Sequence, residues 1–73
     1  MSIITLRVPA FLEMIVWLND NVSPVLPRPK NKTFIPDAIG EDWTLIATNT
    51  IVQYIVEVHL PNEFASAFCL RFA

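Results

Sequence analysis

Few side chains in this 73-residue chain could carry out catalysis or bind a metal ion. There is one cysteine, Cys69, and one histidine, His59, and the two could in principle pair as nucleophile and base. Cys69, however, stands between Phe68 and Leu70, where we expect a small buried thiol instead. A structural zinc site uses four Cys or His ligands, and this chain offers two. The sequence therefore predicts that the protein is not an enzyme and that it holds no metal or other cofactor.

The remaining polar groups favour structural roles. His59 and Glu57 are two residues apart in an expected strand, so they lie on one side of it and could share a hydrogen bond or a weak metal contact. Gly40 is the only glycine, which excludes a glycine-rich phosphate-binding loop. Three carboxylates before Trp43 lack the alternating spacing of a calcium loop. We expect a solvated loop at these residues, which are Asp37, Glu41 and Asp42.

The composition is that of a small apolar domain. Hydrophobic residues make up 53% of the chain and charged residues 16%, the mean hydropathy is +0.47, and the net charge is −2 with a pI near 5.0. These values exclude a disordered chain and a strongly basic nucleic-acid-binding domain, and a single cysteine excludes a disulfide scaffold. A domain of about 60 residues buries only about 60% of the surface of its unfolded chain. We therefore expect apolar surface that a second copy or another protein covers.

No membrane segment or secretion signal is expected. The longest apolar run, residues 11–18, contains Glu13, whereas a membrane span needs about 20 consecutive apolar residues. No basic segment precedes Ile3 and no small-residue cleavage site follows it, although a signal peptide requires both. We expect a cytoplasmic protein, in which a free cysteine stays reduced.

The first part of the chain predicts a strand followed by a helix. Residues 3–8 are rich in β-branched residues and end at Pro9, which favours a strand. From Ala10 the apolar residues follow helical spacing, in a stripe made of Phe11, Ile15, Leu18 and Val22. Val16 and Trp17 flank the opposite, solvent-facing side. Because this helix is apolar almost all round, we expect it to contact something on two sides.

Residues 23–42 predict a long loop with four prolines and no periodicity. We interpret it as a proline-stiffened connector whose second half is held to the body by Phe34 and Ile35. Its basic residues could also make a weak, salt-sensitive contact with nucleic acid, and these are Arg28, Lys30 and Lys32. Residues 37–63 carry five carboxylates, so docking of an acidic body on a basic protein surface agrees at least as well with the charges.

The second part predicts a hairpin and a short helix. Residues 43–48 and 51–60 have the strongest strand patterns, with a tight turn at residues 49–50. In the second strand the even positions from Val52 are apolar and would face the helix. The odd positions form a mixed face that includes Ile51 and Ile55.

The tail has two interpretations. Residues 62–69 predict a short helix, with Phe64 and Phe68 one turn apart, and residues 70–72 a brief closing strand. A strand over residues 63–72 is the alternative.

Together these elements predict an α+β fold in a single domain, residues 1–73. A small antiparallel sheet with one long and one short helix, in the order β-α-β-β-α(-β), is a reduced ferredoxin-like arrangement. The expected core is Ile4, Leu6, Phe11, Ile15, Leu18, Trp43, Leu45, Val52, Tyr54, Val56, Val58, Phe64 and Phe68.

Three stretches of the chain resemble small uncharacterised tailed-bacteriophage proteins. They are the helix end at residues 17–22 (WLNDNV), the hairpin entry at residues 41–44 (EDWT) and the tail at residues 60–72 (LPNEFASAFCLRF). The tail is similar to a recurring phage ending, in which an acidic short helix with an alanine and a phenylalanine leads to leucine, a basic residue and a terminal aromatic residue. The resemblance implies a phage protein acting in the host cytoplasm, and it implies no particular reaction.

We expect a non-enzymatic protein-binding module, and the resemblance implies a phage-encoded inhibitor or modulator of a host enzyme or defence protein. The alternatives are a homo-oligomeric structural or assembly protein, and a weak nucleic-acid binder through residues 28–32. No membrane partner is expected. Large aromatic and apolar side chains are the usual anchors of protein interfaces. The candidate contacts are Val16, Trp17, Arg28, Lys30, Lys32, Phe34, Ile51 and Ile55.

Overall fold

The sheet consists of four antiparallel strands in the order β1-β4-β3-β2, and two helices pack against it. The computed structural model describes residues 1–27 and 37–72. The elements in chain order are β1 (Ser2–Val8), α1 (Leu12–Asn21), β2 (Ala38–Ile39), β3 (Thr44–Asn49), β4 (Tyr54–Leu60) and α2 (Asn62–Phe72). The predicted α+β class is confirmed, but the helices are of similar length, 10 and 11 residues. No helix within the two described ranges is long and apolar enough to cross a membrane.

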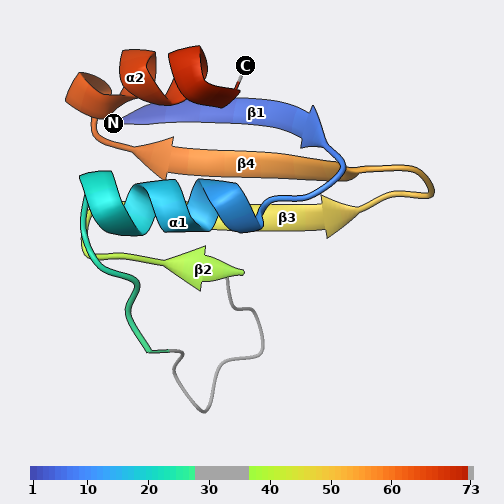
Figure 1. Ribbon diagram of the computed structural model, residues 1–73, viewed down its shortest axis with the longest axis horizontal. Helices are drawn as coiled ribbons and strands as arrows, with labels where there is room; N and C mark the ends of the chain where they lie inside the picture. Colours follow the sequence, from blue (N-terminus) through green and yellow to red (C-terminus); the bar gives the residue numbers. More distant parts are fainter. Residues whose placement is uncertain (28–36, 73) are drawn as a thin grey trace.

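The core lies between the helices and one face of the sheet. Alternate residues of β3 and β4 point to this face, and the buried set is Met14, Leu18, Ala38, Trp43, Leu45, Val56, Val58, Leu60 and Phe68. In Figure 1, α1 lies in front of β3 and β4 with its axis nearly along these strands, and α2 runs along β1. The other face carries Thr5, Glu57 and Ile46 in one row across three strands. No helix among the described residues covers that face, which we call the open face.

The predicted core is confirmed except at Val52. Val52 is 87% exposed, whereas the other predicted residues are buried or packed against the buried cluster. Three buried hydrophobic residues were not predicted, namely Met14, Ala38 and Leu60. Met14 lies one turn before Leu18, so the buried stripe of α1 is wider than the predicted one.

The β3–β4 hairpin has a longer loop than predicted. β3 extends to Asn49 and β4 begins at Tyr54, and these two residues pair across the hairpin. Thr50 closes the loop, because its N–H donates to the Gln53 carbonyl at 2.8 Å and its hydroxyl exchanges hydrogen bonds with the Gln53 backbone. The predicted two-residue turn is therefore wrong, and the two apolar residues after Thr50 stand in the loop instead of the strand.

α2 continues to Phe72, so the predicted closing strand at residues 70–72 is wrong, and so is the alternative strand over residues 63–72. The helix continues because Phe64, Phe68 and Phe72 recur every four residues and extend one apolar stripe by a further turn. Without a strand after α2, the reduced ferredoxin-like arrangement is not confirmed.

The predicted loop over residues 23–42 contains regular structure near its end. Ala38 and Ile39 form β2, which pairs with β3 on one side. On the other side the N–H of Leu26 donates to the Ile39 carbonyl at 2.8 Å. Residues 28–36 of this segment lie outside the described residues.

Trp43 fixes the chain around β2. Its indole Nε1 donates to the Ser23 carbonyl at 2.8 Å, and the ring is buried. Gly40 lies so close to this ring that a Cβ on Gly40 would overlap the indole.

The N–H of Ala47 donates to Asp37 Oδ2 at 2.6 Å, so one carboxylate of the predicted solvated loop is instead partly buried and tied to β3. The other two carboxylates of that loop are exposed, as predicted.

Candidate protein-binding site

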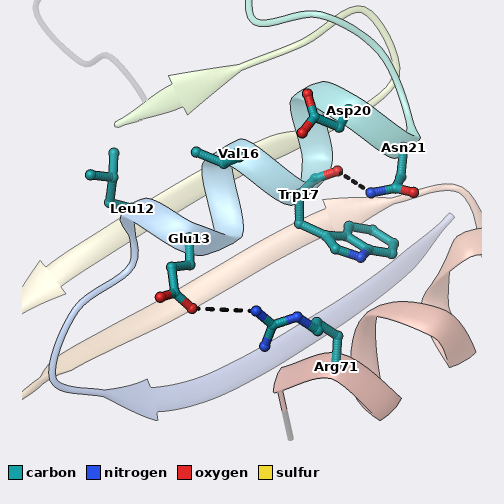
Figure 2. Close-up of a pocket in the computed structure, with 7 residues that line it drawn as sticks. All are labelled: Leu12, Glu13, Val16, Trp17, Asp20, Asn21 and Arg71. Carbon is teal, nitrogen blue, oxygen red and sulfur yellow. Dashed lines mark hydrogen bonds and ion pairs between the residues drawn. The ribbon is translucent and has the colours of Figure 1, made fainter.

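A hollow of about 290 Å³ lies between α1 and the last turn of α2. It is lined by Leu12, Glu13, Val16, Trp17, Asp20, Asn21 and Arg71. All but Arg71 come from α1, because residues three and four positions apart share one side of a helix. Figure 2 shows Arg71 reaching across from α2 toward α1. We call this hollow and its lining the α1 groove.

The walls of the α1 groove are largely apolar. Leu12 and Val16 are one helical turn apart, and they are 70% and 51% exposed. Trp17 is partly buried, and its ring meets Phe68 and Phe72 edge to face, with centroid distances of 5.6 and 6.3 Å. A ring held in this way beside two exposed aliphatic side chains is typical of the anchoring centre of a protein interface.

The polar side chains give the α1 groove a small negative charge. Glu13 Oε2 lies 3.5 Å from Arg71 Nη2, and both side chains are exposed, so the ion pair is weak. Asp20 is a second exposed carboxylate, and α1 contains no lysine or arginine. The amide of Asn21 donates to the carbonyl of Trp17 at 2.9 Å (Figure 2), which occupies that carbonyl at the end of the helix. The lining thus contains two carboxylates and one guanidinium, and the guanidinium is paired with Glu13 alone.

A second hollow of about 420 Å³ adjoins the α1 groove at the start of the helix. The two hollows share Leu12 and Glu13, and the second is also lined by Pro9, Ala10, Met14 and Phe72. Together they follow α1 from its first turn to its last, which is a length of about 15 Å. A helix or an extended segment of a partner could contact this whole length.

The predicted contact residues lie on different surfaces. Val16 and Trp17 lie together in the α1 groove. Ile51 is fully exposed in the hairpin loop, and Ile55 lies on the open face, where it lines a hollow of about 190 Å³ with Val52. The other candidates lie outside the described residues, as does the predicted anchor Ile35; they are Arg28, Lys30, Lys32 and Phe34.

Two residues of the α1 groove were not predicted as contacts. Leu12 stands four positions before Val16, so its place on the same side of the helix could have been read from the spacing. Arg71 was expected in a closing strand, and no pattern in the sequence indicates that it lies beside Glu13.

The side chains with more specific chemistry are not part of the groove lining. His59 Nε2 lies 2.5 Å from Glu57 Oε2 on the open face, so of the two contacts considered for this pair the structure shows the hydrogen bond. Cys69 is a free and partly buried thiol of α2. Among residues 1–27 and 37–72, no group of three or more His, Cys, Asp or Glu side chains is arranged to hold a metal ion.

Comparisons with other proteins identify no relative. No protein-family model, no curated protein and no solved structure matches the chain. The fold and the α1 groove are therefore the basis on which a function can be proposed.

Proposed function

We propose that this protein is a non-enzymatic protein-binding module whose α1 groove holds an apolar, positively charged segment of its partner. The observation that carries the proposal is the exposure of Leu12 and Val16 beside the fixed ring of Trp17. In a helix that packs against the core by one side only, large aliphatic side chains are expected on that side. Their exposure on the outer side leaves apolar surface for a partner to cover.

Burial of this apolar surface supplies the driving force for binding. Covering a largely exposed Leu12 and a half-exposed Val16 contributes on the order of 1–2 kcal/mol each. The ring of Trp17 adds a rigid contact that loses little conformational freedom on binding, because Phe68 and Phe72 already hold it.

The charges of the groove indicate the chemistry of the partner. Glu13 and Asp20 lie on either side of Val16 along α1, and Arg71 offsets only one of them. An amphipathic helix with apolar residues one turn apart and lysine or arginine between them would satisfy both the walls and the charges. The charges would mainly speed association, and they would make it sensitive to salt.

The resemblance to small tailed-phage proteins supports a host protein as this partner. In that case the chain is a phage-encoded inhibitor or modulator of a host enzyme or defence protein, and it acts in the host cytoplasm. It would act by occupying a basic helix or segment that the host protein needs for its own contacts.

The test compares a groove variant with a matched control. Leu12→Ser/Val16→Ser removes the apolar wall, whereas Leu70→Ser removes an 88% exposed leucine that is outside the groove lining. The partner is captured from host lysate with the unmodified chain, identified by mass spectrometry, purified and titrated by calorimetry. We expect the groove variant to bind about tenfold more weakly or worse, and Leu70→Ser to bind as the unmodified chain does. Equal affinity of all three proteins would refute the α1 groove as the binding site.

A charge test examines the proposed chemistry of the partner separately. Glu13→Gln/Asp20→Asn keeps the shape of the groove and removes both carboxylates. We expect slower association and a weaker dependence of the rate on salt, with a smaller change in dissociation. An association rate that is unaffected by the substitutions at low salt would rule out a basic partner segment.

Self-assembly is the second candidate function, and the hairpin loop is the observation that favours it. Ile51 is fully exposed and Val52 is 87% exposed, so the loop presents two adjacent β-branched side chains to solvent. Light scattering over a range of protein concentrations distinguishes the two functions. A particle mass that stays at one chain favours the binding module, and a mass that rises with concentration favours assembly.

A further inference from the structure

The outer edge of β1 is an unpaired strand edge. All seven residues of β1 pair with β4 in one continuous register, from Ser2 with Leu60 to Val8 with Tyr54. β1 stands at the end of the strand order, so no described strand lies on its other side. In an antiparallel strand about half of the N–H and C=O groups point to each side. The outward groups of β1 pair with no backbone group among the described residues.

The opposite edge of the sheet, at β2, is protected from pairing with another strand, whereas the outer edge of β1 is not. β2 has only two residues, and on its outer side Leu26 donates to Ile39 while Val25 bridges Gly40. Proteins usually shorten, interrupt or cover their edge strands, because an open edge is a template for another strand. Within the described residues β1 is long, has no proline or bulge, and carries a single charged side chain, Arg7.

The helix-side residues of β1 are also incompletely covered. Ile4 and Leu6 are partly exposed, whereas Val58 and Val56, their partners on β4, are fully buried. A further strand beside β1 would cover these side chains as β1 covers those of β4. An extended chain beside β1 would therefore both pair with its outward N–H and C=O groups and cover its partly exposed side chains.

We propose that the outer edge of β1 binds an extended segment of a partner protein as a fifth, antiparallel strand, with an acidic residue of that segment opposite Arg7. This is a second binding site on a different part of the molecule from the α1 groove. Strand addition of this kind takes its affinity from main-chain hydrogen bonds and its specificity from alternate side chains.

Arg7 supplies the charge selectivity. It is exposed on the open face, across from Ile55 of β4, and it lines the hollow of about 190 Å³ there. The ion pairs among the described residues join other side chains, His59 with Glu57 and Arg71 with Glu13. The guanidinium of Arg7 therefore has no carboxylate partner within the described residues, and a cross-strand acidic residue would provide one.

A foreign segment fits this edge better than a second copy of the chain. α2 runs along β1 (Figure 1), and the hydroxyl of Ser2 donates to Asn62 at the start of α2 at 2.7 Å. If two copies paired through β1 about a two-fold axis, both α2 helices, each about 10 Å wide, would lie near that axis and compete for the same space. A single extended segment brings no helix with it.

The register defines a probe peptide. In an antiparallel alignment the capped peptide acetyl-Ser-Glu-Val-Thr-Val-Ile-Ser-amide places its glutamate opposite Arg7, its threonine opposite Thr5 and its isoleucine opposite Ile3. Its two valines lie on the helix side, next to Leu6 and Ile4. One control peptide carries lysine in place of glutamate. A second carries proline in place of the threonine and the valine that follows it, which removes two adjacent main-chain donors.

Titration of the chain with each peptide, followed by amide NMR shifts and hydrogen exchange, tests the proposal. We expect weak binding by the glutamate peptide, with Kd on the order of 1 mM, and slower exchange of alternate amides of β1. The lysine peptide should bind about fivefold more weakly, and the proline peptide should not bind. In Arg7→Glu the preference should reverse, so that the lysine peptide binds more tightly than the glutamate peptide.

The proposal fails if the glutamate peptide causes no shifts at millimolar concentration, or if the shifts map away from β1. It also fails if Arg7→Glu leaves the peptide preference unchanged. The groove variant Leu12→Ser/Val16→Ser should bind the peptide as the unmodified chain does. This control separates failure at the β1 edge from failure at the α1 groove.

Discussion

The indole ring of Trp17 meets the ring of Phe68 edge to face, with the ring centroids 5.6 Å apart and the planes at 77°. Phe68 is fully buried, while Trp17 remains partly exposed in the α1 groove. One side chain therefore packs α1 against α2 and also forms the inner wall of the groove. A change at Trp17 alters the helix packing and the binding surface together, which is why the binding test uses Leu12 and Val16 instead.

Trp17→Ala should lower the free energy of unfolding by about 2–3 kcal/mol. The substitution removes ring contacts with Phe68 and Phe72 and leaves a gap between the helices, but the partial exposure of the ring keeps the loss below that of a fully buried tryptophan. Urea denaturation followed by circular dichroism measures the change. Val16→Ala, on the exposed side of the same helix, is the control and should stay within about 0.5 kcal/mol. A stability loss at Trp17 no larger than at Val16 would contradict the packing role.

Gly40→Ala should destabilise the protein by about 2–3 kcal/mol. A methyl group at Gly40 overlaps the indole of Trp43, so the ring must move, and its hydrogen bond to Ser23 is lost. The φ angle of Gly40 is not positive, so the cost is steric and does not come from the backbone conformation. Thermal and urea unfolding measure the stability, and tryptophan fluorescence reports the displaced ring.

A double-mutant cycle identifies Trp43 as the cause of this cost. Trp43→Phe removes Nε1, which is both the hydrogen-bond donor and the ring atom nearest to a Cβ on Gly40, so Gly40→Ala should cost about 1 kcal/mol less in that background. An equal cost of Gly40→Ala in both backgrounds would show that the clash with the indole is not responsible.

Much of the fold can be predicted from local sequence patterns, and the errors in the predicted fold have local causes. Strand β1 and the buried side of β4 follow the two-residue period, so Ile4, Val56 and Val58 are placed correctly. The prediction of a two-residue hairpin turn is wrong because the hydroxyl of Thr50 bonds the backbone of Gln53. Hydrophobic alternation does not reveal this contact. The predicted strand over residues 51–60 therefore begins three residues too early.

The candidate site is predictable only in part. Helical spacing alone places Val16 on the outer side of α1. Trp17, which the same spacing predicted to flank the solvent-facing side, is partly buried and packs against the core. The inner wall and the charge of the groove depend on where α2 packs, and this packing is set by the contacts of Phe68 and Phe72 with Trp17. Long-range contacts of this kind leave no periodic signal in the sequence, so Arg71 could not be placed there in advance.

The hairpin loop provides the last prediction, which concerns solubility and not folding. Ile51 and Val52 are almost fully exposed, and the loop is closed by the hydrogen bonds between Thr50 and Gln53. Ile51→Ser/Val52→Ser should therefore change the free energy of unfolding by no more than about 0.5 kcal/mol. It should also reduce any increase of light scattering with protein concentration, because two adjacent apolar side chains leave the surface.

Leu70→Ser is the matched control for the loop variant, since it also removes exposed apolar surface but does so on α2. If association takes place through the loop, Leu70→Ser should scatter light as the unmodified chain does while Ile51→Ser/Val52→Ser scatters less. Equal reduction by both variants would mean that association follows total apolar exposure and not the loop. Scattering unchanged by the loop variant would remove Ile51 and Val52 from any self-association surface, and it would leave the α1 groove as the surface to test.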